Sequence, residues 1–140
     1  MPPLLIVLDT SVVAAAALGS PDASSAAVLD AVASGDVRLA LSDDYLDEMS
    51  RTMRKPYLEE NASVGEAFRI ALALAYMGRS YRPVCHDWPS IPDRTDWWLL
   101  DLAFESGADA IVTWNTRHLG PARSLGFEVA TPPEFLEKLR

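Results

Sequence analysis

The 140-residue sequence is poor in cysteine and lysine. A single cysteine, Cys85, excludes an internal disulfide and gives no support to a thiolate metal site. Lys55 and Lys138 are the two lysines, and the formal charge is −8 with an isoelectric point near 4.6. Proteins that grip nucleic acid through a broad basic face depend on Lys and Arg to neutralise phosphates. Any contact of this chain with nucleic acid is therefore expected to be local.

Long hydrophobic runs are also missing. The first apolar run, residues 4–8, is too short to cross a membrane and has no basic residue before it, so neither a membrane span nor a signal peptide is indicated. A cytoplasmic protein without membrane contact is expected. The length and the 49% apolar composition suffice for one core, which predicts a single domain over residues 1–140.

Apolar runs and helical stripes alternate along the chain. Strands are predicted at 4–8, 37–41, 82–85 and 110–113, with one more before the last helix. Helices are predicted at 12–18, 23–34 and 62–78, from Ser42 or Asp43 to a break at Pro56, from 93 to a stop at Gly107, and from Thr131 onward. The apolar side of helix 62–78 would include Leu72 and Tyr76. This order predicts an α/β fold, a three-layer α/β/α sandwich with a mainly parallel central sheet.

Two acids stand at positions where carboxylates can do chemistry. Asp9 ends the first strand, and ligands of parallel sheets bind at the carboxyl edge; as an alternative, Asp9 caps the following helix. Glu48 lies in the second turn of its helix, beyond capping range, and borders the apolar stripe of that helix. Its alternative is an exposed ion pair with Arg51.

Two further acids and two polar residues occur later in the chain. Asp93 and Asp96 can cap the helix that they open, yet Asp96 shares a helical face with apolar residues and would need a partner there. Thr113 and Asn115 follow the strand 110–113, at the same sheet edge as Asp9 if the strands are parallel. Asn115 can instead simply start a turn.

The ordered set of "LDTSV", Glu48, "DRTD" and "ADAIVTWN" resembles the PIN domain over essentially the whole chain. It looks most like the bacterial PIN proteins that act as VapC-like toxins of toxin–antitoxin pairs. The resemblance implies a ribonuclease in which Asp9, Glu48 and Asp96 are the catalytic and metal-site carboxylates. It also implies an RNA substrate, a cognate antitoxin and a homodimer.

Three carboxylates that converge need a compensating charge, and oxygen ligands favour Mg²⁺ or Mn²⁺. Asp9 and Asp96 are expected to bind the ion directly, with Glu48 and Asp93 acting through water. Thr10 or Ser11 is expected to orient Asp9. Where many PIN domains carry a fourth acid, this sequence has Asn115, which keeps open a second function: an inactive PIN-like module that binds RNA or a protein partner.

The basic and the aromatic side chains each have two possible roles. Arg51, Arg54, Lys55, Arg117 and His118 could guide an RNA backbone, or they are ordinary solvated groups. The four tryptophans, Trp88, Trp97, Trp98 and Trp114, are expected in core packing or at a dimer or antitoxin interface rather than in base stacking.

Overall fold

A five-stranded sheet forms the centre of the protein, for which a computed structural model describes residues 2–19, 23–61 and 64–140. All pairs of neighbouring strands are parallel, in the order β3-β2-β1-β4-β5. The strands are β1 (Leu4–Leu8), β2 (Val37–Leu41), β3 (Arg79–Ser80), β4 (Ala110–Val112) and β5 (Val129–Ala130).

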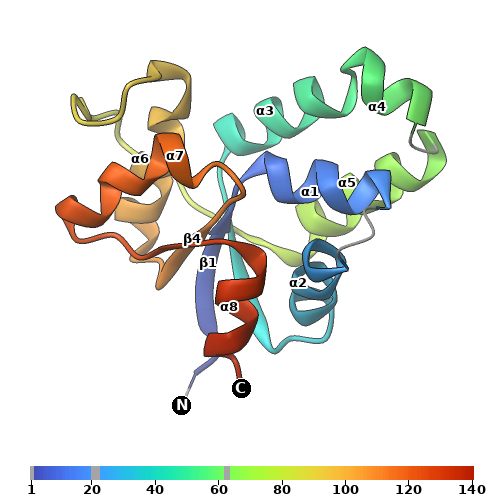
Figure 1. Cartoon of the computed structure of the whole chain (residues 1–140), viewed down its shortest axis with the longest axis horizontal. Coiled ribbons are helices and arrows are strands. Elements are labelled where there is room, and N and C mark those ends of the chain that lie inside the picture. Colours follow the sequence, from blue (N-terminus) through green and yellow to red (C-terminus); the bar gives the residue numbers. More distant parts are fainter. Residues whose placement is uncertain (1, 20–22, 62–63) are drawn as a thin grey trace.

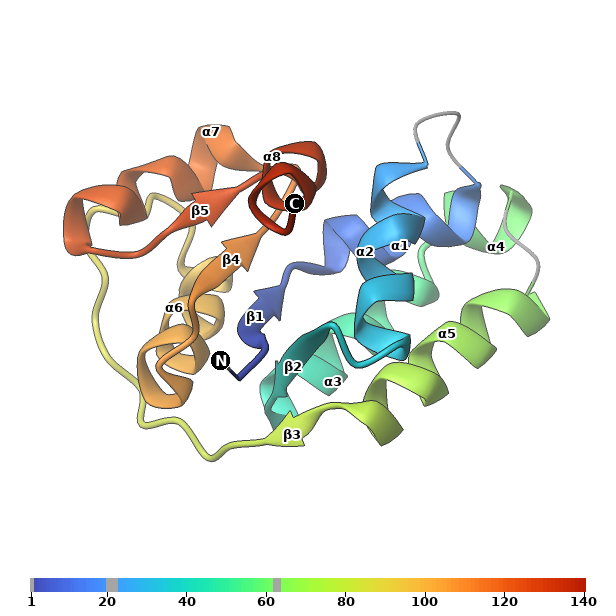
Figure 2. The ribbon, with the colours of Figure 1, turned by 90° about the horizontal axis from the view of Figure 1, so that it is seen from below.

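Helices cover both faces of this sheet, as Figures 1 and 2 show. They are α1 (Thr10–Leu18), α2 (Ser24–Ala33), α3 (Asp43–Met53), α4 (Pro56–Asn61), α5 (Val64–Met77), α6 (Trp97–Ser106), α7 (Thr116–Leu119) and α8 (Pro132–Lys138), with 3-10 turns at Arg94–Asp96 and Gly120–Leu125. Helix α6 packs over β1, β2 and β4 on one face, while α2, α5 and α8 lie toward the other face (Figure 2). The predicted α/β/α sandwich is confirmed.

The central position of β1 explains its sequence. A strand between two others, with helices above and below, has no face in water, so an uninterrupted apolar run fits it. Leu5 is 4% exposed, and Ile6, Val7 and Leu8 are fully buried. Leu8 is in register with Val112 of β4. The residues that follow these two strands therefore emerge side by side at the carboxyl edge.

The third strand is not where the sequence predicted it. Residues 82–85 have no regular structure, and β3 instead pairs Arg79 and Ser80 with Ala40 and Leu41 of β2. The chain turns into β3 at Gly78, where a Cβ atom would lie 2.4 Å from the side chain of Leu41. Pro83 has no N–H to donate to a ladder, which disfavours a strand through it.

Helix boundaries and one helix face also differ from prediction. A separate helix, α4, begins at Pro56, because proline is well suited to the first turn of a helix. The predicted start of the next helix at residue 62 lies outside the described residues. Leu74 is buried on that helix, whereas Leu72 is 55% and Tyr76 91% exposed. The predicted inward face was wrong at Leu72 and Tyr76, because residues two positions away from Leu74 lie on the opposite side of a helix.

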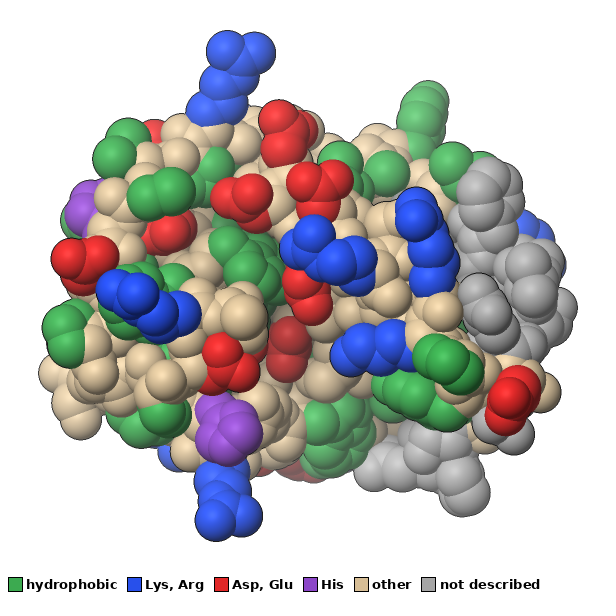
Figure 3. Space-filling model, turned by 90° about the horizontal axis from the view of Figure 1, so that it is seen from above, with side chains coloured by type: hydrophobic (Ala, Val, Ile, Leu, Met, Phe, Trp, Pro, Cys, Tyr) green, Lys and Arg blue, Asp and Glu red, His purple; other side chains and the backbone are tan. Residues whose placement is uncertain are grey.

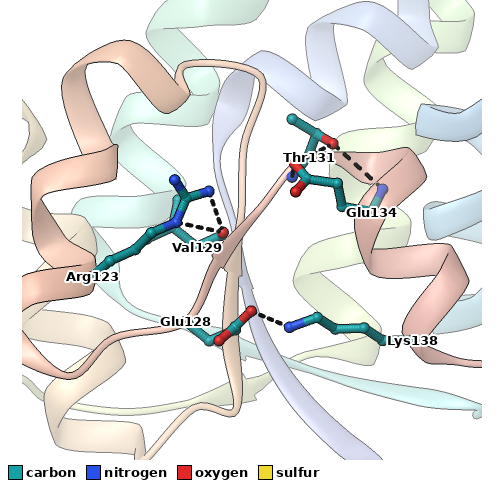
Figure 4. Close-up of polar contacts among 6 residues, drawn as sticks. All are labelled: Arg123, Glu128, Val129, Thr131, Glu134 and Lys138. Atoms are coloured by element: carbon teal, nitrogen blue, oxygen red, sulfur yellow. Dashed lines mark hydrogen bonds and ion pairs between the residues drawn. The ribbon is translucent and has the colours of Figure 1, made fainter.

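The C-terminal helix begins as predicted. Thr131 Oγ1 accepts a hydrogen bond from the backbone N–H of Glu134, and the Glu134 carboxylate accepts one from the Thr131 backbone N–H (Figure 4). The same close-up shows Arg123 donating twice to the carbonyl of Val129, and Lys138 paired with Glu128. Arg123 thus ties the preceding 3-10 turn to β5, and Lys138 ties the end of α8 to the residue before β5. Among the described residues, no helix has the length and apolar character needed to span a membrane.

Candidate metal and active site

Asp9 is held at the carboxyl edge of the sheet by donors from two parts of the chain. Its Oδ2 accepts a hydrogen bond from Ser11 Oγ at 2.9 Å and from Thr113 Oγ1 at 2.6 Å. The Asp9 backbone N–H donates to the carbonyl of Val112, which continues the β1–β4 pairing by one residue. Asp9 is 8% exposed and Thr113 is fully buried. The carboxylate therefore has one orientation.

The capping alternative for Asp9 is not what the structure shows. Asp9 occupies the N-cap position of α1, but its side chain makes no capping hydrogen bond. No described residue donates a hydrogen bond to its Oδ1, so that oxygen is available to a ligand. Of the two candidates for orienting Asp9, Ser11 makes the hydrogen bond. Thr10 lies buried in the first turn of α1, and a role for it stays a prediction.

Asp96 is a partly buried acid whose pKa is raised. Partial burial, followed by the negative charges of Asp9, Asp93 and Glu48, raises the pKa of Asp96 to about 6, while His118 acts in the opposite direction. Asp96 is the N-cap of α6 but makes no side-chain capping bond. The carboxylates of Asp9, which follows β1, and Glu48 on α3 thus both act on the charge of Asp96 at the start of α6. This convergence was the expectation on which the metal-site hypothesis depended.

Glu48 reaches the same region but is already paired. Its Oε2 accepts hydrogen bonds from Arg51 Nη2 at 2.9 Å and Nε at 3.2 Å. The ion-pair alternative for Glu48 is therefore correct. The charge of Glu48 also helps to raise the pKa of Asp96. The arginine partly neutralises the cluster without a lysine. Arg94, which the sequence allowed as another counter-ion, instead stacks over the ring of Trp97 at 5.0 Å.

Asp93 is an exposed capping residue. Its Oδ1 accepts hydrogen bonds from the backbone N–H and from the hydroxyl of Thr95, at 2.9 and 2.7 Å. These bonds hold the pKa of Asp93 below its usual range. The cap alternative is correct for Asp93 but not for Asp96, and a water-mediated metal role for Asp93 stays a prediction.

Asn115 stands beside the acids, at the start of α7. Its backbone N–H donates to Thr113 Oγ1 at 2.9 Å, and its side-chain Nδ2 lies 3.3 Å from His118 Nδ1. Thr113 thus accepts from Asn115 while it donates to Asp9, which gives its hydroxyl hydrogen a fixed direction. None of the described residues donates a hydrogen bond to the side-chain carbonyl oxygen of Asn115. This oxygen is therefore available to a cation.

The donor set fits a hard divalent cation that takes few protein ligands. Asp9 Oδ1 and the Asp96 carboxylate are oxygens without hydrogen bonds from the described residues, and Mg²⁺ commonly binds one or two carboxylates and several waters. The fit has a limit, since within the described residues no three His, Cys, Asp or Glu side chains are grouped closely enough to hold one ion. Glu48, the expected third acid, is paired with Arg51 instead. In the view of Figure 3, acidic side chains gather around the middle of the molecule, and Lys and Arg side chains stand among them and around them.

Two residues that sequence reasoning did not assign to the site also lie here. Tyr45 is fully buried on α3, and none of the described residues is a hydrogen-bond partner of its hydroxyl. Burial first, and then the charge of Asp9, raise the pKa of Tyr45. Asp101 on α6 is 7% exposed and accepts hydrogen bonds from the backbone N–H of His86 and from Trp88 Nε1, both at 2.9 Å. A buried aspartate in the middle of an apolar helix was a signal that could have identified it.

Comparison with known proteins gives one answer. No curated protein matches the chain. The model of the family described as "PIN domain" matches residues 5–117, a stretch that includes Asp9, Glu48, Asp96 and Asn115. PIN domains are in general nucleases and typically use divalent metal ions. With most of its length matched and a parallel sheet at its centre, the chain belongs to the PIN domain family.

Proposed function

We propose that the protein is an endoribonuclease that depends on Mg²⁺ or Mn²⁺, with Asp9, Glu48 and Asp96 as its catalytic carboxylates. The observation that supports the proposal is electrostatic: the charge of Asp9, at the carboxyl edge of the sheet, helps to raise the pKa of Asp96 to about 6. Two acids that repel each other in a folded protein are costly unless a cation or a proton joins them. Family membership supports the nuclease part of the proposal.

Each residue has a role in this chemistry. Asp9 and Asp96 would hold the ion, and Glu48 and Asp93 would act through water. When bound, a divalent cation polarises a phosphate and lowers the pKa of water. Glu48 or Asp96 would accept the proton of the attacking water. Ser11 and Thr113 keep Asp9 in place throughout.

A second candidate function has specific support. Glu48 is paired with Arg51, and Asn115 stands where many PIN domains have an acid. An RNA-binding or protein-binding module without hydrolysis would need neither a free Glu48 nor a fourth carboxylate. The two candidates differ in whether RNA is cut.

Cleavage of a labelled single-stranded RNA by the purified chain, with Mg²⁺ or Mn²⁺ and with EDTA, tests the proposal. Asp9→Asn and Asp96→Asn are expected to abolish metal-dependent cleavage while remaining folded. Asp30→Asn, an exposed residue on α2, is the matched control and should cleave like the wild type. Equal behaviour of all four proteins would exclude the assigned site. Metal-independent binding of RNA without cleavage by the wild type would favour the second candidate.

We also propose that the protein is the toxin of a toxin–antitoxin pair and forms a homodimer, on the strength of the sequence resemblance. Growth arrest on expression, relieved by the product of a small neighbouring reading frame and absent with Asp9→Asn, is the expected result for the toxin. Sedimentation equilibrium should give twice the 15.3 kDa chain mass. Normal growth of cells making active enzyme would contradict the toxin role, and a monomer would contradict the dimer.

A further inference from the structure

A pocket of about 610 Å³ opens beside the acids, between α3 and the start of α6. Glu48 and Arg51 line it on the α3 side, where it borders the catalytic region. Trp97, Trp98 and Asp101 line it on the α6 side, and the loop that carries His86 closes a third side. Its volume is in the range of sites that take small organic ligands. A strand of RNA passing the acids would place a nucleotide next to this pocket.

Asp101 gives the pocket a specific hydrogen-bonding character. Its side chain is 9% exposed, and the two short hydrogen bonds from His86 and Trp88 both go to Oδ1. Among the described residues, none donates to Oδ2. Oδ2 keeps some contact with solvent, and a ligand that supplies an N–H group can take the place of water on this oxygen. The pocket therefore offers a hydrogen-bond acceptor to a ligand that carries an N–H donor.

The remaining walls fit the other parts of a nucleotide. Trp97 and Trp98 are partly buried, and Trp98 packs edge-on against Tyr45 with the ring centroids 5.5 Å apart, so indole surface is presented in a fixed position. Aromatic side chains bind bases by stacking. Arg94 is exposed at the rim, stacked on Trp97, and forms no ion pair with the described residues. Its guanidinium is free to meet a phosphate.

We propose that this pocket binds one base of the RNA strand next to the cut and prefers bases that carry an amino group. This inference rests on the proposed ribonuclease function and names the feature of the substrate that the site selects. The amino groups of adenine, cytosine and guanine donate to Asp101 Oδ2. Uracil offers carbonyl oxygens on both sides of its single N–H, and these are repelled by a carboxylate.

Binding of CMP and UMP to the whole protein in EDTA tests the pocket without any cleavage, because the two nucleotides differ mainly in an amino or carbonyl group. NMR titration is expected to show CMP binding about tenfold more tightly than UMP, the size of one specific hydrogen-bond contact. The indole N–H signals of Trp97 and Trp98 should shift. The indole of Trp114, which donates to Ser25 on α2, is an internal control and should not shift.

Asp101→Asn tests the acceptor role of Oδ2 most directly. An asparagine oxygen still accepts from His86 and Trp88, while the amide nitrogen turns the position of Oδ2 from an acceptor into a donor. The preference should then shift from CMP toward UMP by at least tenfold. Arg94→Gln should weaken both nucleotides equally, about fivefold for one lost phosphate contact, and Asp30→Asn should change neither.

The outcomes separate this inference from the ribonuclease proposal. If the protein binds the nucleotides with these shifts but cuts no RNA, the base-binding pocket is supported and the ribonuclease function is refuted. RNA cleavage by a protein that binds neither nucleotide, or that binds CMP and UMP equally, would refute the pocket and leave the enzyme standing. If Asp101→Asn does not fold, the wild-type titration with its tryptophan signals decides alone.

Discussion

Replacing Asp96 with asparagine should stabilise the protein when no metal is present. The side chain keeps its shape but loses the charge that Asp9, Asp93 and Glu48 repel. A rise in pKa from 3.8 to about 6 corresponds to about 3 kcal/mol of unfavourable free energy for the charged form at neutral pH. Because Asp96 is only partly buried, solvent screening reduces the expected gain to about 1–1.5 kcal/mol, a rise in melting temperature of about 3–6 °C.

The pH dependence of this stabilisation follows from the binding of a proton to Asp96. A raised carboxyl pKa means that the folded protein binds the proton more tightly than the unfolded chain, so the wild type loses stability as the pH rises from about 4 to about 6. The difference between Asp96→Asn and the wild type should be small at pH 4 and complete at pH 7.

These differences are measured as melting temperatures of the wild type and Asp96→Asn at pH 4 and pH 7, in EDTA and in saturating Mn²⁺. Asp30→Asn is the control. In Mn²⁺ the order should reverse, because the wild type is stabilised by the ion and the variant has lost a ligand. An Asp96→Asn protein that melts below the wild type at pH 7 in EDTA would refute the claim that repulsion dominates at Asp96. An unchanged order in Mn²⁺ would refute the shared ion.

Three further results are expected. The affinity for Mn²⁺, measured by calorimetry, should rise between about pH 5 and pH 7, as the ion displaces the proton of Asp96; a flat profile would exclude Asp96 as a ligand. Thr113→Val removes the 2.6 Å bond to Asp9 and should lower the unfolding free energy by about 1–3 kcal/mol and the Mn²⁺ affinity about tenfold; unchanged affinity would mean that Asp9 needs no such support. Tyr45→Phe removes a buried hydroxyl that has no partner and should stabilise the metal-free protein by about 1 kcal/mol in chemical denaturation; a loss of that size would reveal an unseen partner.

The sequence by itself determined the layout of the fold and the order of the acids. An apolar run that stops at Asp9 predicts a buried parallel strand with a carboxylate at its functional end, and β1 has that place. Thr131 and Glu134 predicted the start of the last helix, because both partners of a capping box lie within one turn of each other. Such features depend on neighbours along the chain, and therefore they can be read from a single sequence.

Tertiary structure alone decided which alternative each acid follows. Asp93 and Asp96 have the same capping potential in sequence. In the structure Thr95 donates a hydrogen bond to Asp93, whereas Asp96 is partly buried and its pKa is raised by the charge of Asp9. The pairing of Glu48 with Arg51, the exposure of Tyr76 and the place of β3 likewise depend on what lies opposite each side chain. Electrostatic coupling and burial act across space between residues far apart in the chain, and the pattern along the sequence does not contain those distances.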